Sequence, residues 1–278
     1  MAARTTDQDR DGHVGPEPAL DAADTRNAAW VERSDSFFRL LKAGCPHDAR
    51  DLAVEAVAQA PEGSAIAASW MANLGDCYRR LRDAPHAIEQ FQRAVATFEV
   101  LGDLPGQAIG HKCLGKCQQS FGDVRVAIEE YQRALAIHQQ LGSRYGRADQ
   151  LDSLGSCYRK LGDLHAAIEH HQRALVLYEQ VDSLFGQASQ HNRLGCCLQA
   201  LGNLPAAIEH HQRALVLFEQ DGSLLGQARV LASLGFIFAD RARAHDALTR
   251  AAELYRRLGA KKYAGSLSRV LAGLEGLA

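Results

Sequence analysis

The chain has 278 residues, a formal net charge of −2 and 46% apolar residues, so it is long enough to bury a sizeable core. This charge argues against a general nucleic-acid binder, which would carry a basic surface, and no apolar run is long enough to span a membrane. The seven cysteines are odd in number and follow no secretory signal, so we expect reduced thiols in a cytoplasmic protein.

Residues 1–27 are polar and contain Gly, Pro and Asp, which predicts a disordered tail. Within it, DQDRDGHV (7–14) matches the first half of a calcium-binding loop. Such a loop needs a bidentate glutamate at its twelfth place, where this chain has Pro18, with Glu17 one residue early. A charged tail therefore explains the segment better than a calcium site.

From residue 64 to residue 259 the sequence repeats every forty residues. The pair Leu74–Gly75 returns at 114–115, 154–155, 194–195 and 234–235, and the segment AIEHHQRALVL occurs at both 167–177 and 207–217. In each unit, apolar residues at helical spacing predict two helices. A glycine followed by Asp or Asn separates them, because glycine suits the left-handed end of a helix and Asp or Asn caps the next. These pairs are Gly122–Asp123, Gly162–Asp163 and Gly202–Asn203.

A glycine also lies inside each first helix, where it costs about 1 kcal/mol relative to alanine. In the third unit this glycine, Gly155, recurs together with a small residue of the second helix, Ala167. The pairing predicts a close approach of the two helix backbones there.

This pattern resembles the tetratricopeptide repeat. The signature of that repeat is matched by Leu74, Gly75, Tyr78, Ala87 and Phe91, with Met71 in the tryptophan position. Forty-residue versions are similar to those of kinesin light chains, spindle-orienting adaptors and the C-terminal arrays of actinobacterial regulators.

The resemblance implies an all-α, right-handed superhelical solenoid of about five to six antiparallel helical hairpins over residues 28–278. Residues 28–62 would form a divergent first hairpin, 64–259 the clear repeats and 262–277 a capping helix.

Four cysteines, Cys77, Cys117, Cys157 and Cys197, recur at the forty-residue spacing, and Ile237 takes the next place. Replacement by isoleucine indicates a small apolar core position. Neighbouring hairpins pack about 8–10 Å apart, too far to share one zinc ion. We therefore expect no metal and no cofactor.

The doubled histidines have different expected roles. His171 and His211 take the place that Phe91 and Tyr131 hold in earlier units, which predicts a packing role. Their neighbours, His170 and His210, correspond to Gln90 and Glu130, and we expect all four on an outer, exposed face. Adjacent histidines on a helix point about 100° apart and cannot converge on one ion. The sequence also has no Gly-rich phosphate loop and no nucleophile motif, so we predict no catalytic residues and no enzyme.

In the resembled family the first helices line a concave groove that binds peptides. Carried over, the groove positions are Asn73, Asp76, Arg79, Arg80, Lys112, Lys116, Gln119, Asp149, Asp152, Arg159, Lys160, Asn192, Arg193, Gln199, Arg229 and Asp240. They include eight basic and four acidic residues, a net +4 on a chain of net −2. Such a surface would attract an acidic segment, although solvated charges on a helix face are an equal alternative.

The resemblance therefore implies a non-catalytic scaffold that binds an acidic protein or peptide, with no nucleic-acid or membrane partner. Two alternatives stay open: a peptide-responsive regulator that acts through a partner, and an enzyme or enzyme accessory of a bacterial biosynthetic pathway.

Overall fold

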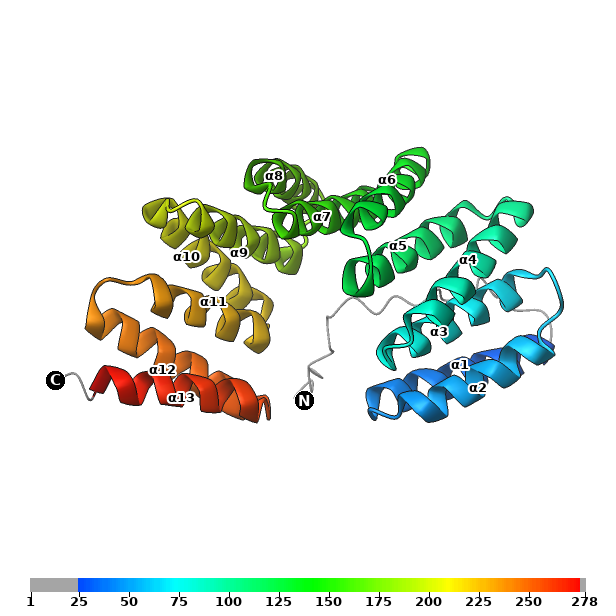
Figure 1. Cartoon of the computed structure of the whole chain (residues 1–278), viewed down its shortest axis with the longest axis horizontal. Helices are drawn as coiled ribbons and strands as arrows, with labels where there is room; N and C mark the ends of the chain where they lie inside the picture. Colours follow the sequence, from blue (N-terminus) through cyan, green and yellow to red (C-terminus); the bar gives the residue numbers. More distant parts are fainter. Residues whose placement is uncertain (1–24, 276–278) are drawn as a thin grey trace, which may run out of the picture. The chain divides into compact units, whose positions relative to one another are not determined.

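The computed structural model describes residues 25–275, and every regular element among them is an α-helix (Figure 1). The helices are α1 (Thr25–Lys42), α2 (Pro46–Gln59), α3 (Ala65–Arg80), α4 (Ala84–Leu101), α5 (Leu104–Phe121), α6 (Val124–Gln140), α7 (Arg144–Lys160), α8 (Leu164–Gln180), α9 (Leu184–Ala200), α10 (Leu204–Asp221), α11 (Leu224–Ile237), α12 (Arg241–Arg257) and α13 (Lys261–Glu275). Successive helices pair into six hairpins, and α13 packs on α12. The predicted all-α array with a final helix is confirmed. The tail prediction and the calcium-like stretch fall outside the described residues, apart from Thr25–Asn27, which belong to α1.

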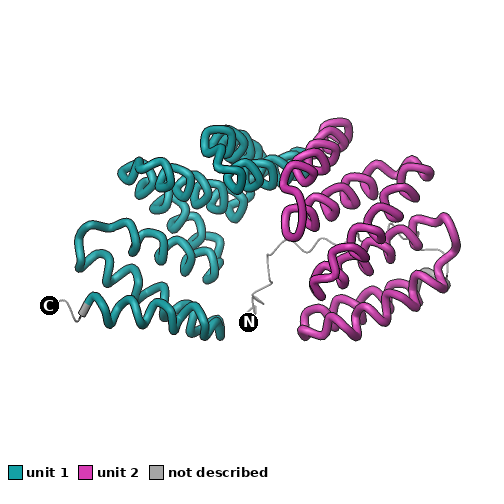
Figure 2. Tube along the Cα trace, viewed as in Figure 1, with its two compact units in different colours: residues 1–7, 144–278 teal, residues 8–143 magenta. Residues whose placement is uncertain are grey.

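The chain divides into two compact units, which meet in the sequence between Ser143 and Arg144 (Figure 2). One contains α1–α6 and the other α7–α13. Within each unit, first helices of neighbouring hairpins contact each other, α3 with α5 and α9 with α11. Among the described helices, the second helices make no comparable contact with one another. The first helices therefore form the more closely packed side of each unit. None of the described helices is long and apolar enough to cross a membrane.

The predicted turns are confirmed at two of three positions. Gly162 and Gly202 are left-handed, with φ of +83° and +80°. The next residues cap the following helices: Asp163 accepts from the backbone N–H of Ala166 at 3.0 Å. The prediction is wrong at Gly122, whose φ is −132°, because α5 continues one residue further than its counterpart α7 and the chain leaves it in an extended conformation.

In α3, α5, α7 and α9 the repeated glycine lies against a ring of the second helix, whereas Gly235 of α11 lies against Leu248. A Cβ on Gly155 would lie 2.7 Å from Cε1 of His171, and one on Gly115 would lie 2.7 Å from Cε1 of Tyr131. The three atoms nearest to a Cβ on Gly155 all belong to the ring of His171, a contact that we did not predict, and the close approach of the backbones at Gly155 and Ala167 stays a prediction. The prediction that His171 packs in the aromatic position is confirmed, since it is fully buried. The same contact recurs between Gly75 and Phe91 and between Gly195 and His211.

The recurring cysteines lie in the core, as predicted. Cys77, Cys117, Cys157 and Cys197 are all 0% exposed, and none of them forms a disulfide. Burial raises the pKa of the Cys77 thiol to about 12, which keeps it protonated and unreactive at neutral pH.

The last hairpin departs from the others at its turn. Helix α11 ends at Ile237, and Asp240 accepts from the backbone N–H of Arg243 at 2.7 Å as the N-cap of α12. The assignment of Asp240 to the first-helix surface is therefore wrong, because α11 ends before reaching it. Helix α13 covers α12 with Ala264 and Leu267.

Candidate functional site

The predicted groove residues divide between the two units. We call the first set the α3–α5 face; it comprises Asn73, Asp76, Arg79, Arg80, Lys112, Lys116 and Gln119. The second set, the α7–α9 face, comprises Asp149, Asp152, Arg159, Lys160, Asn192, Arg193 and Gln199. Arg229 lies on α11 and is exposed.

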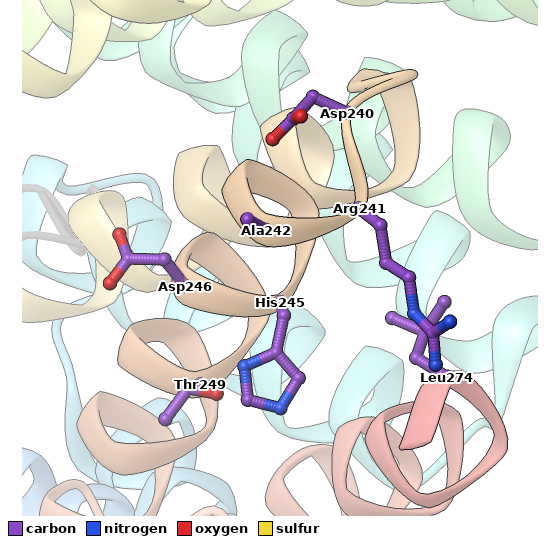
Figure 3. Close-up of a pocket in the computed structure, with 7 residues that line it drawn as sticks. All are labelled: Asp240, Arg241, Ala242, His245, Asp246, Thr249 and Leu274. Carbon is purple, nitrogen blue, oxygen red and sulfur yellow. The ribbon is translucent and has the colours of Figure 1, made fainter. Parts of the chain in front are cut away.

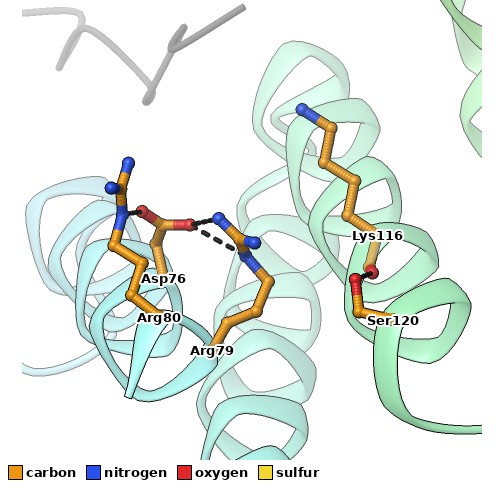
Figure 4. A network of polar contacts seen from close by, with 5 residues as sticks. All are labelled: Asp76, Arg79, Arg80, Lys116 and Ser120. Carbon is orange, nitrogen blue, oxygen red and sulfur yellow. Dashed lines mark hydrogen bonds and ion pairs between the residues drawn. The ribbon is translucent and has the colours of Figure 1, made fainter. Parts of the chain in front are cut away.

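On the α3–α5 face, Asp76 holds two arginines in place (Figure 4). Its Oδ1 accepts from Nε and Nη2 of Arg79 at 3.0 and 2.5 Å, and its Oδ2 accepts from Nε of Arg80 at 2.7 Å. Burial alone would raise the pKa of Asp76, but the adjacent Arg79 and Arg80 hold it below its ordinary value. The carboxylate therefore stays charged and fixes both guanidinium groups, whose side chains are 25% exposed.

The next first helix adds Lys112 and Lys116 to the same face. Arg80 and Lys116 extend their charged ends toward the same side of the two helices (Figure 4). The face thus has four basic residues and one acidic residue, a net +3.

Two residues with amide side chains, Asn73 and Gln119, were also predicted for this face. Asn73 is only 6% exposed and faces the core. Gln119 accepts a long hydrogen bond of 3.4 Å from the hydroxyl of Tyr131. Asn73 is therefore not available to a ligand, whereas the charged residues and Gln119 are half-buried.

The α7–α9 face contains an ion pair that ties two hairpins together. Nε of Arg193 lies 2.6 Å from Oδ1 of Asp152, and Nη1 of Arg193 donates to Ser156 at 3.0 Å. Nδ1 of His171 donates to Oε1 of Gln190 at 2.9 Å and lies 3.4 Å from Asp152. Burial opposes ionisation of Asp152, but Arg193 and then His171 lower its pKa to about 2. Asp152 and Arg193 therefore neutralise each other and stabilise the packing of α7 and α9.

The remaining charges of this face are Arg159 and Lys160, both exposed, and Asp149, which is half-buried. Oδ1 of Asn192 accepts a hydrogen bond from Nδ1 of His211 at 3.1 Å, so Asn192 provides a polar partner for a buried ring. Compared with the α3–α5 face, this face offers fewer positive charges to a ligand.

Residues 107–180 match the family model of the tetratricopeptide repeat. These residues form tetratricopeptide repeats. Similar solved structures share the fold over a longer stretch. A STAND protein (Signal Transduction ATPase with Numerous Domains) with a tetratricopeptide repeat sensor, from Pyrococcus horikoshii, is 17% identical with a TM-score of 0.73. That match covers 88% of this chain but only 38% of the STAND protein.

Two further structures have the same fold. A Rap protein complexed with Competence and Sporulation Factor is 14% identical with a TM-score of 0.66, and the match covers 89% of this chain and 75% of that one. A putative kinesin light chain from Podospora anserina, with nearly identical TPR-like repeats, is 16% identical with a TM-score of 0.60, over 70% of this chain and 98% of that one. No curated protein shows significant sequence similarity to the chain.

The second helices also have a buried polar position, which we predicted from the sequence to lie on the outer face. Gln90 is 7% and Glu130 8% exposed, and His170 and His210 are half-buried, so the prediction of exposed side chains is wrong. Nδ1 of His111 donates to Glu130 at 2.7 Å.

The equivalent contact two repeats later is a histidine pair. The Nδ1 atoms of His191 and His210 lie 3.0 Å apart, so one ring donates to the other. Burial, and then His210, lower the pKa of His191 to about 4. Each of these pairs is 19 residues apart in the sequence, and this recurring separation is the signal that could have revealed them.

One pocket of the array was not anticipated. It is open, has a volume of about 680 Å³ and lies between α12 and the end of α13 (Figure 3). Asp240, Arg241, His245, Asp246 and Leu274 contribute to its lining. These side chains carry both signs of charge, so the pocket favours neither anions nor cations.

Proposed function

We propose that the chain is a non-catalytic, cytoplasmic binding scaffold whose α3–α5 face binds an acidic segment of a partner protein. The observation that carries this proposal is the arrangement around Asp76, which holds Arg79 and Arg80 in place beside Lys116 of the next hairpin. Fixed guanidinium groups suit carboxylates, because their planar N–H donors match the two oxygens. Ordering these side chains in the free protein also reduces the entropy lost on binding.

The charge balance supports the same ligand chemistry. The face has a net charge of +3, whereas the whole chain has −2. A local patch of this kind attracts an acidic ligand and suppresses binding of a basic one.

A regulatory role is the second candidate, and two similar structures favour it. One is the tetratricopeptide repeat sensor of a STAND protein, and the other is a Rap protein in complex with Competence and Sporulation Factor. By analogy, binding at the α3–α5 face would alter how this chain acts on another protein.

Fluorescence anisotropy with a labelled acidic probe tests the proposal. The probe is a fluorescein-labelled peptide of alternating Glu and Gly, titrated with the full chain at low salt. The double variant Lys112→Glu/Lys116→Glu should bind it at least about tenfold more weakly, a loss of about 1.4 kcal/mol. Circular dichroism confirms that the variant is folded.

The matched control is Arg93→Glu/Arg125→Glu, with the same charge change on exposed positions of α4 and α6 in the same unit. It should change the dissociation constant by less than about twofold. Equal losses in the two variants would indicate unspecific charge attraction. No loss in the first variant would remove the α3–α5 face as the binding site.

A further inference from the structure

An acidic segment is available within the chain itself. Residues 1–24 precede α1 and lie outside the described residues. They contain six acidic and two basic side chains, a net −4: Asp7, Asp9, Asp11, Glu17, Asp21 and Asp24 against Arg4 and Arg10. Since the whole chain has a net −2, the remaining residues have −2 − (−4) = +2. The chain thus joins an acidic segment to a basic array.

The segment is long enough to reach the α3–α5 face. It is attached at Thr25, the first residue of α1, in the same unit as α3 and α5. Packed helices are separated by about 8–10 Å, so the four steps from α1 to α5 amount to at most about 40 Å. An extended segment of 24 residues spans up to about 80 Å. Its length therefore allows contact with both α3 and α5.

We propose that residues 1–24 bind the α3–α5 face of their own chain as an internal ligand that an acidic partner must displace. This inference rests on the proposed function, because it assigns an occupant to the same face. Attachment to the array raises the effective concentration of the segment to the order of millimolar. Even a weak electrostatic contact, with a dissociation constant about half of that concentration, then occupies the face about two thirds of the time.

The distribution of lysines allows a direct test in the full chain. The chain has six lysines: Lys42, Lys112, Lys116, Lys160, Lys261 and Lys262. Two of them lie on the α3–α5 face, and the last two lie exposed on α13, where they serve as internal references. Mass spectrometry after brief acetylation gives the rate at each site.

The test variant replaces Asp7, Asp9 and Asp11 with Asn and Glu17 with Gln. The acetylation of Lys112 and Lys116, relative to Lys261 and Lys262, should rise at least about threefold. The control variant Arg4→Gln/Arg10→Gln makes the segment more acidic and should lower or preserve the ratio. An unchanged ratio in the test variant overturns the inference. A ratio that rises in the unaltered chain on dilution would mean that the segment of a second copy covers the face, which also overturns it.

Two labelled probes separate this inference from the proposed function. One is a peptide with the sequence of residues 1–24, and the other is the Glu-Gly peptide. Both should bind the test variant at least about threefold more tightly than the unaltered chain, because its face is vacant more of the time. If the Glu-Gly peptide binds both chains equally and the 1–24 peptide binds neither, the inference fails and the proposed function stands. If neither probe binds the test variant, both fail.

Discussion

The two units fill the same core position with different chemistry. In the α1–α6 unit Gly75 and Gly115 lie against Phe91 and Tyr131, and in the α7–α13 unit Gly155 and Gly195 lie against His171 and His211. A Cβ on these glycines would lie 2.7–2.8 Å from the nearest atom of each of the four rings, so both apolar and polar rings fit the position in these repeats. The repeat thus keeps the same shape at this point while its polarity varies.

The histidines bring additional polar contacts. His171 requires Gln190 and lies beside Asp152, which in turn pairs with Arg193. A buried polar group without a hydrogen-bond partner lowers the stability of the fold. Replacing one member of this network should therefore destabilise the unit unless its partner is replaced as well. At the ring position the α7–α13 unit therefore depends on a buried polar network, where the α1–α6 unit has Phe91 and Tyr131.

The largest effect is expected when a ring is removed. Phe91→Ala should lower the free energy of unfolding by about 3–5 kcal/mol, because it leaves a cavity at a fully buried position. Phe236→Ala, at a position 58% exposed, is the matched control and should cost less than about 0.5 kcal/mol. Urea denaturation measures both, and similar costs would contradict the packing role of the ring.

Exchanging polarity at the same position should cost less. His171→Phe keeps the ring but leaves Gln190 without its donor, which should cost about 1–3 kcal/mol. The double variant His171→Phe/Gln190→Leu should recover most of that loss, since it replaces both polar partners. Tyr131→Phe, which removes the long 3.4 Å hydrogen bond to Gln119, should cost less than about 1 kcal/mol. A double variant no more stable than His171→Phe would argue against the network.

A smaller effect is expected from pH. Burial, and then His210, lower the pKa of His211 to about 4, whereas an unfolded histidine has a pKa of about 6.5. Below pH 6.5 the unfolded chain therefore binds a proton that the folded chain does not, so stability falls as the pH drops toward 4. Between pH 7.5 and 5.5 this ring should cost the α7–α13 unit about 1 kcal/mol. In His211→Tyr the pH-dependent loss should shrink by that amount in urea titrations at the two pH values, and an unchanged loss would contradict it.

The smallest effect is expected at an exposed ion pair. Glu209 and Arg213 are 61% and 59% exposed, so Arg213→Ala should change the free energy of unfolding by less than about 0.5 kcal/mol. Arg193→Ala should cost more, because its partner Asp152 is only 17% exposed and would be left unpaired. Equal effects in thermal denaturation would show that the network around Asp152 contributes no more than a surface pair.

The sequence predicted the hairpins because a period of forty residues repeats the same stop and start signals. It failed for the side chains next to the ring position, such as Glu130 and His210. Those were assigned to the outer face because they point about 100° away from the ring. Helix α10, however, packs against both α9 and α11, and α8 against both α7 and α9. A helix covered on two sides buries a wider arc than a one-sided amphipathic pattern suggests.

The candidate site was predicted in part. The basic positions of the α3–α5 face follow from the register of the repeat, but the roles of individual charges do not. Arg193 and Arg79 look alike in the sequence, yet Arg193 joins two hairpins through Asp152, whereas Arg79 pairs with Asp76 of its own helix. Only the packing of neighbouring hairpins decides between these roles.

Binding of an acidic ligand to the first helices of the α1–α6 unit can be located on the chain itself. Photo-crosslinking with a benzophenone-bearing Glu-Gly peptide, followed by mass spectrometry of the crosslinked fragments, gives its position. We expect crosslinks within Ala65–Arg80 and Leu104–Phe121, and their loss in Lys112→Glu/Lys116→Glu. Crosslinks concentrated in the second helices α4 and α6, unaffected by that variant, would contradict the proposed binding face.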